Sequence, residues 1–128
     1  MSRELVETGR AFEKKIAHSA GVVAEGRFLF TSGLTSRDDV GNIVGVGDMA
    51  AQTKRVFANL ADVLAVAGAD FSKVVKFTIY VTDIDGYRDA LSGDRSFMIG
   101  APASTLIEVS RLASPELLIE VEAIVALD

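Results

Sequence analysis

The run Leu-Leu-Ile-Glu-Val-Glu-Ala-Ile-Val-Ala-Leu, residues 117–127, has the strongest strand pattern in the chain. Successive side chains of a strand point to opposite faces, so Glu120 and Glu122 share one face, roughly 7 Å apart. The other face takes the apolar residues Ile119, Val121, Ala123 and Val125. The run therefore predicts a core strand whose second face carries two carboxylates and needs a covering.

Two further runs predict strands that accompany it. Residues 72–83 form one of them, in which apolar and polar side chains alternate from Val75 to Thr82, and residues 104–112 follow a Pro-containing turn. Residues 113–115 read as a turn, so we expect 104–112 and 117–127 to form a hairpin. On that pairing Ser104, Leu106 and Glu108 would face the two glutamates, and Arg111 would point to the opposite face.

Helical periodicity marks two segments. Asp48 is a good N-cap for a helix over residues 48–68, and Gly68 suits its C-terminal end. Residues 87–98 predict a second, weaker helix that Ser92-Gly93 interrupts, after a turn over residues 83–86.

The N-terminal third predicts short strands over residues 5–8, 18–24 and 28–32. The last two are separated by Glu25-Gly26-Arg27 and should form a hairpin. A polar loop over 36–47 follows, in which Ile43-Val44 would add a short strand.

This order of elements predicts one α+β domain, residues 1–128, with two helices packed on one face of a sheet. The helices require the apolar, odd-numbered face of strands 73–83, 104–112 and 117–127. The other sheet face is left bare and partly apolar, so we expect it to pack against other subunits.

Composition narrows the classes of function. The net charge is −5 and the pI about 4.8, which argues against a nucleic-acid surface held by clustered Lys and Arg. The chain has no cysteine, which excludes disulfides and thiolate chemistry. Neither a signal peptide nor a bilayer-spanning run is visible, so we expect a cytoplasmic protein. The hydrophobic share of 49% favours a subunit interface.

Several motifs carry only weak chemical signals. Gly45-Val46-Gly47-Asp48-Met49-Ala50 matches a dinucleotide-binding pattern, but Asp48 would repel a phosphate, so a loop with an N-cap is favoured. A single histidine, His18, is too little for a metal site, and it reads as a strand-edge residue or as part of a pocket lining. Ser32 and Ser104 lack the surroundings of a nucleophilic serine.

Glu108, Glu120 and Glu122 are the best candidates for chemistry. A carboxylate on a half-apolar face can act as general acid or base. The alternative is a solvated face or an intersubunit salt bridge, because most acidic side chains are structural surface.

Motifs along almost the whole chain resemble those of the Rid (RidA/YjgF) family. They are Phe28-Leu29-Phe30-Thr31-Ser32-Gly33, Gln52-Thr53, Asn59-Leu60, Ala67-Gly68-Ala69, Val74-Val75-Lys76, Val81-Thr82-Asp83 and Ile119-Glu120-Val121-Glu122-Ala123-Ile124. The resemblance implies a chorismate-mutase-like α+β fold and a homotrimer with ligand clefts between adjacent subunits. It also implies no metal and no organic cofactor. The best-studied members hydrolyse enamines and imines to 2-keto acids and ammonia.

The resemblance assigns roles to individual residues. Glu120 matches the glutamate that positions the attacking water, Ser32 and Gly33 match a cleft-lining pair, and Tyr80 falls at a cleft aromatic. The family pattern Pro-Ala-Arg-Ser/Thr reads Pro102-Ala103-Ser104-Thr105 here, and a cleft tyrosine is replaced by Ser19 beside His18. Serine cannot replace a bidentate arginine clamp on a carboxylate, which argues against ordinary 2-imino acids as substrates.

Two classes of function therefore stay open. In the first, Glu120 is catalytic and a small-molecule ligand is bound by His18, Ser19, Ser32, Gly33, Tyr80, Ser104 and Thr105. In the second, the trimer binds a metabolite or a protein partner without turnover. Endoribonuclease activity, an older label of the family, fits the acidic charge less well.

Overall fold

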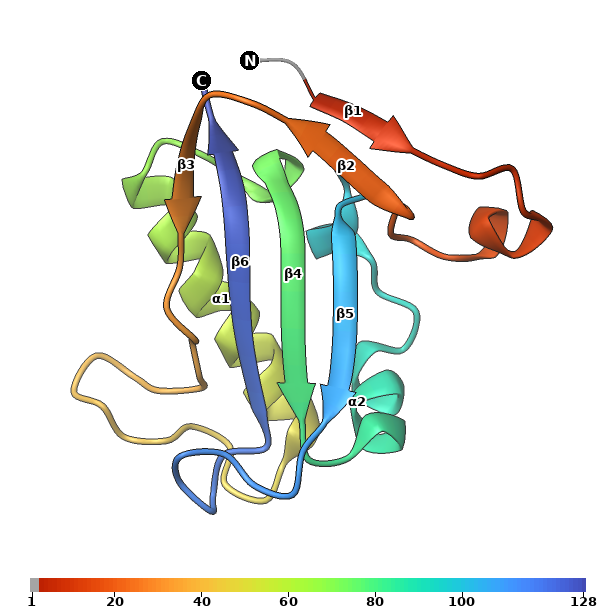
Figure 1. The fold of residues 1–128 in the computed structure, drawn as a ribbon. Coiled ribbons are helices and arrows are strands. Elements are labelled where there is room, and N and C mark those ends of the chain that lie inside the picture. Colours follow the sequence, from red (N-terminus) through yellow and green to blue (C-terminus); the bar gives the residue numbers. More distant parts are fainter. Residues whose placement is uncertain (1–2) are drawn as a thin grey trace.

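A four-stranded sheet forms the centre of the computed structural model, which describes residues 3–128 (Figure 1). Its strand order is β3 (Arg27–Phe30), β6 (Ile119–Leu127), β4 (Val74–Val81) and β5 (Ala103–Glu108). Strand β6 runs antiparallel to both β3 and β4, whereas β4 and β5 are parallel. A parallel pair requires a crossover connection, and α2 (Ile84–Leu91) supplies it.

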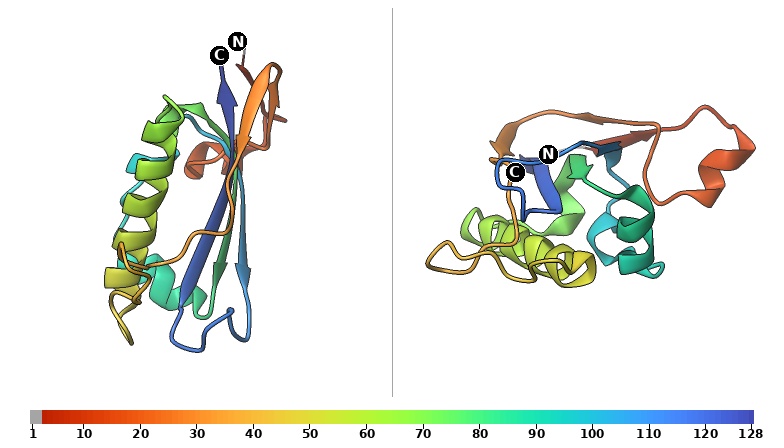
Figure 2. Two further views of the ribbon diagram at one scale, coloured as in Figure 1. Left: turned by 90° about the vertical axis from the view of Figure 1, so that its left-hand side faces the viewer. Right: turned by 90° about the horizontal axis from the view of Figure 1, so that it is seen from below.

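Both helices, α1 (Met49–Val66) and α2, cover the same face of the sheet (Figure 2). The predicted α+β architecture with two helices on one face is therefore confirmed. Burial explains it, because the odd-numbered residues of β4 and β6 are buried under the helices as their alternation predicted. Among the described residues, no helix has the length and apolar composition that crossing a bilayer would need.

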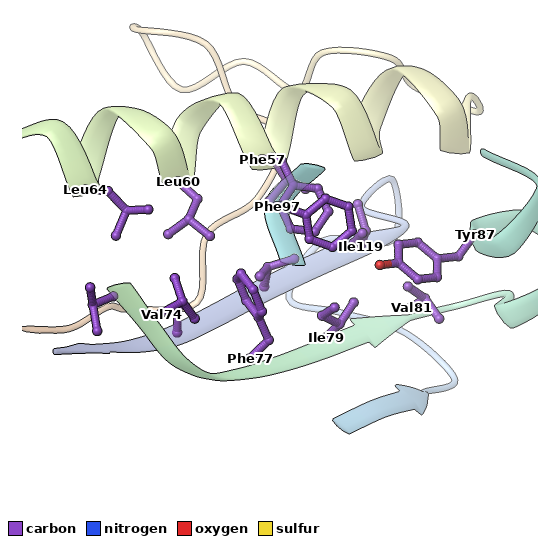
Figure 3. Close-up of a cluster of buried hydrophobic side chains, with 14 residues drawn as sticks. Phe57, Leu60, Leu64, Val74, Phe77, Ile79, Val81, Tyr87, Phe97 and Ile119 are labelled. Carbon is purple, nitrogen blue, oxygen red and sulfur yellow. The ribbon is translucent and has the colours of Figure 1, made fainter. Parts of the chain in front are cut away.

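The core between helices and sheet is built around three phenylalanines. Phe57 of α1 stacks on Phe97 with ring centroids 4.0 Å apart, and Phe77 of β4 meets both rings edge-on. Figure 3 shows Leu60 and Leu64 continuing this layer along α1. Burial of these side chains holds α1 against the sheet and so decides which sheet face is covered and which stays open.

The long helix follows its sequence signals closely. The Asp48 carboxylate accepts a hydrogen bond of 3.0 Å from the Ala51 amide, as an N-cap does. Gly68 follows the helix with φ +77°, a left-handed conformation that favours glycine. The buried Gln52 side chain is hydrogen-bonded to Gly45, Glu116 and Leu118, so it ties the chain just before β6 to the start of α1.

The second helix is shorter and earlier than predicted. Asp83 caps α2 through the Gly86 amide, so the expected turn over residues 83–86 is the first turn of the helix. Ser92 and Gly93 both have positive φ and end it. The segment η3 (Ser96–Met98) is a separate 3₁₀ turn that returns Phe97 to the core. The predicted helix over 87–98 is therefore wrong in its second half.

Two predicted strand pairings are wrong. Strand β2 (Gly21–Ala24) pairs with β1 (Arg3–Val6) in a separate two-stranded sheet, while β3 pairs with β6. The short Gly26 turn thus joins strands of different sheets. Likewise β5 and β6 form no hairpin, because β4 lies between them. In the predicted loop strand, Ile43 makes only an isolated bridge to Arg37. A second 3₁₀ turn, η1 (Ala11–Lys15), precedes β2, and η2 (Phe71–Lys73) precedes β4.

Candidate functional site

Glu120 lies on the open face of the sheet, next to a β-bulge that follows β3. Thr31 is hydrogen-bonded to Ala123, and Leu34 is hydrogen-bonded to Val121. The two residues between Thr31 and Leu34, which are Ser32 and Gly33, are therefore opposite a single residue of β6, Glu122. Both Ser32 and Gly33 are exposed. The bulge carries the backbone at Gly33 close to the carboxylate, and a Cβ built on Gly33 would lie 2.0 Å from Glu120 Oε2.

Tyr80 and Glu122 complete this part of the open face. Tyr80 on β4 is directly opposite Glu120 on β6 in the strand register. Its hydroxyl donates a 3.0 Å hydrogen bond to Glu122 Oε1. This hydrogen bond, and next to it desolvation, raise the pKa of Tyr80, so the hydroxyl keeps its proton. Glu122 thus has a protein partner, whereas the Glu120 carboxylate makes no hydrogen bond with any of residues 3–128. We call Ser32, Gly33, Tyr80, Glu120 and Glu122 the Glu120 group.

The four other predicted binding residues gather at the opposite edge of the sheet. His18, Ser19, Ser104 and Thr105 line one hollow of about 260 Å³, which we call the edge hollow. Lys76 also lines it and donates a 2.6 Å hydrogen bond to the Thr105 hydroxyl. Sequence reasoning missed Lys76, although its place on the polar face of β4 was a usable signal.

Ser19 has a structural role within this hollow. Its side chain is buried, and its hydroxyl donates a 2.6 Å hydrogen bond to the Ala101 carbonyl. Its amide donates to the Pro102 carbonyl. Ser19 therefore attaches the segment before β2 to the start of β5, and so holds His18 beside Ser104.

The register of β5 overturns the predicted facing of its side chains. Phe77 pairs with Ser104, and Ile79 pairs with Leu106. Because Phe77 and Ile79 are core residues, the even-numbered residues of β5 lie on the helix face, and Thr105 and Ile107 lie on the open face. Ser104 and Leu106 therefore do not face the two glutamates.

Glu108 and Arg111, which sequence reasoning also considered, lie outside both groups. Glu108 accepts a 3.1 Å hydrogen bond from the Ile84 amide and so satisfies the first turn of α2. The Arg111 guanidinium donates to carbonyls of its own loop. Gly45 packs tightly against Ala51 of α1, and Asp48 caps that helix, in keeping with a loop and N-cap.

Ser104 also lines a second cavity that sequence reasoning missed. This inner cavity of about 280 Å³ lies on the helix face, between β5 and the segment from α2 to η3. His18 and Ser104 line both hollows, so the two are neighbours. Tyr87, Arg88 and Arg95 stand on the helix side of the inner cavity. Tertiary packing brings them to the same cavity as Ser104, so their placement leaves no sequence motif.

The two groups of predicted residues are separated within one chain. Glu120 is opposite Tyr80, and Tyr80 is opposite Ile107, which is three residues beyond Ser104. Two strand spacings across and three residues along give roughly 14 Å between the Cα atoms of Glu120 and Ser104. The two side chains also point to opposite faces. Among residues 3–128, no three His, Asp or Glu side chains converge as a metal site would require.

Comparisons with known proteins agree with this architecture. The family model described as endoribonuclease L-PSP matches residues 8–127. A RutC family protein of Pyrococcus abyssi is 36% identical over 126 residues, which cover 97% of each chain. A Rattus norvegicus protein named 2-iminobutanoate/2-iminopropanoate deaminase is 29% identical over 123 residues, covering 95% of this chain and 88% of that protein.

A solved structure gives the same result for the fold. The Rid family protein YyfB of Yersinia pestis, described as of unknown function, is 34% identical and superposes with a TM-score of 0.87. The match covers 99% of this chain and 100% of the other. The expected chorismate-mutase-like α+β class is thereby confirmed. With sequence motifs, family model and fold in agreement, the chain belongs to the Rid (RidA/YjgF) family.

Proposed function

We propose that the chain is a homotrimeric hydrolase of imines or enamines, whose clefts form between neighbouring copies. The observation that carries the proposal is the separation of the site residues. Glu120 and Ser104 point to different faces of the sheet with Cα atoms roughly 14 Å apart, too far for one small ligand to touch both in a single chain. Association through the half-apolar open face would bring the Glu120 group of one copy to the edge hollow of the next.

Glu120 would act on the water. Its carboxylate lies beside Gly33 and makes no hydrogen bond within residues 3–128, so it is free to accept one from water. The water oxygen forms a bond to the imine carbon, the C=N electron pair moves to nitrogen, and Glu120 takes the water proton. Glu120 passes this proton to nitrogen, which gives the neutral carbinolamine. Glu120 then carries the carbinolamine hydroxyl proton to nitrogen as the C–N bond breaks, so ammonia leaves and the oxygen electron pair forms the C=O bond of the product.

Residues from both halves of the cleft would contact the ligand. Ser32, Gly33 and Tyr80 would line one wall, and His18, Ser104 and Thr105 the other. Ser19 would act by holding that second wall, because its hydroxyl already donates to Ala101. The rat deaminase is named for 2-imino acids, but a serine at position 104 offers no cation beside the reacting carbon.

The assay that tests this function compares the wild type with Ser104→Arg on 2-iminopropanoate generated in situ. A charged hydrogen bond contributes about 1.5–3 kcal/mol, so the arginine variant should hydrolyse this imine about ten- to a hundredfold faster. Release of 2-keto acid and ammonia is the measurement. If the wild type hydrolyses 2-iminopropanoate as fast as the variant does, a guanidinium at position 104 is not needed for this substrate. Ligand-induced stabilisation without product would favour the alternative of a purely binding trimer.

The shared cleft makes a separate prediction for mixed oligomers. Glu120→Gln disables one half of a cleft, and Ser104→Phe fills the other half. In a randomly mixed trimer of the two inactive variants, a cleft has both intact halves with probability one half times one half. Reassembly of a one-to-one mixture should therefore restore about one quarter of the wild-type activity. Activity that stays at the level of the separate variants would place both halves in one copy.

Endoribonuclease activity, which the description of the family model names, fits this chain less well. The net charge is −5, and the open face carries the carboxylates of Glu120 and Glu122 as well as Lys76. Phosphate contacts would need clustered cations instead.

A further inference from the structure

The inner cavity carries charged side chains on one wall and apolar side chains on the others. Arg88 and Arg95 are both exposed, and neither guanidinium forms a hydrogen bond or ion pair within residues 3–128. Two arginines face one carboxylate in this lining, Asp94, which leaves one net positive charge. Asp94 is already engaged, because it accepts a 2.9 Å hydrogen bond from the Ser96 amide.

Tyr87 adds a hydrogen-bond donor to the lining of the inner cavity. Its side chain is only 3% exposed, yet its hydroxyl forms no hydrogen bond within the described part of the chain. Figure 3 shows the ring beside Ile79 and Val81 with the hydroxyl directed toward the core cluster. Burial of the ring raises the pKa of Tyr87, so the hydroxyl keeps its proton and can donate a hydrogen bond to a ligand in the cavity that it lines.

The remaining lining is suited to an apolar ligand body. Ile79, Leu106, Phe97 and Met98 surround the space of about 280 Å³. A pocket that combines apolar walls with a few polar groups on one side fixes both the position and the orientation of a small ligand. The small side chain of Ser104 stands between this space and the edge hollow.

We propose that Arg88 and Arg95 form the anion-binding subsite of the cleft, and that its ligand is an amphipathic carboxylate whose apolar body fills the inner cavity. This inference rests on the proposed function, since it names the substrate class of the same cleft. The guanidiniums stand on the α2–η3 wall and Ser104 on the β5 wall. The acid group would therefore be remote from the reacting carbon, which separates such a ligand from 2-iminopropanoate.

The test is a binding measurement with 3-phenylpropanoate and its neutral counterpart 3-phenylpropanamide, by calorimetry on the full chain. We expect the acid to bind at least tenfold more tightly than the amide, and its affinity to fall as salt screens the charge. Arg88→Gln and Arg95→Gln should each weaken acid binding about tenfold and leave amide binding unchanged. Arg88→Lys and Arg95→Lys retain the charge and should keep part of the affinity. Circular dichroism shows whether each variant is folded.

Arg111→Gln is the matched control, because it removes an exposed arginine that lies outside the cavity lining. Equal binding of acid and amide, absence of binding to the wild type at millimolar concentrations, or an equal loss in the Arg111 variant would each overturn the inference. Binding does not depend on turnover. Tight, arginine-dependent binding of the acid without hydrolysis of any imine would therefore contradict the proposed function and leave the subsite standing.

Discussion

Glu120→Gln is expected to lower kcat for imine hydrolysis by roughly 100- to 10,000-fold, the usual contribution of a general acid–base group. The amide has nearly the shape of the carboxylate, so it still fits beside Gly33 and the fold is preserved. It cannot accept the proton of the attacking water, however. Steady-state release of ammonia measures the loss, and thermal unfolding should show a Tm close to that of the wild type.

Glu122→Gln is the control for this variant. It removes the same charge from the same sheet face, but the Tyr80 hydroxyl can still donate its hydrogen bond to the amide oxygen. We expect kcat to change little. Full activity of Glu120→Gln would remove Glu120 from the mechanism, and equal losses in both variants would point to the charge of the face rather than to one base. Light scattering should give both variants the oligomeric mass of the wild type.

Much of the fold could be predicted because its decisive patterns are local. The alternation in residues 74–81 and 119–127 reports burial on one face, and those strands are buried as predicted. The periodicity and the Asp48 cap predicted α1 to within a residue or two. The Gly26 turn, by contrast, failed as a hairpin signal, because strand pairing depends on contacts far along the chain. Strand β3 pairs with β6, and β2 pairs with β1.

The facing of β5 could not be read from its own residues. Leu106 and Ile107 are both apolar and adjacent, so alternation assigns the core face to neither. β5 lies at the edge of the sheet, and its parallel register with β4 places Leu106 on the helix face and Ile107 on the open face. The predicted hairpin placed Ser104 and Leu106 on the open face instead. Because of the same error, the sequence did not reveal that Ser104 lines the inner cavity.

The sequence predicted which residues belong to the candidate site, but not where they lie relative to one another. The motif resemblance selected Glu120, Gly33, His18 and Ser104, which the structure divides between two sides of the sheet. The contact between Gly33 and Glu120 depends on the bulge after β3, and the role of Arg88 and Arg95 depends on the end of α2 at Ser92. Neither feature has a sequence signal beyond a glycine.

Gly33→Ala should lower kcat by on the order of 100-fold while changing stability little. The added Cβ would lie 2.0 Å from Glu120 Oε2 and 2.7 Å from its Cδ, far inside van der Waals contact. The carboxylate is the far end of a flexible side chain at a half-exposed position, so it can turn away at small cost in folding free energy. A displacement of about 1 Å at a reacting group can cost 100-fold in rate. The kinetic loss should therefore exceed the change in Tm.

Gly21→Ala is the matched glycine control, because a Cβ there would meet only Val6 Cβ at 3.7 Å, an ordinary contact. It should leave both kcat and Tm near the wild-type values. If Gly33→Ala hydrolyses imines at the wild-type rate, the carboxylate position beside Gly33 is not the one that acts on water. If it unfolds at a much lower temperature, the bulge stabilises the sheet rather than placing Glu120. A kinetic defect with an unchanged Tm would show that the bulge after β3 positions the carboxylate.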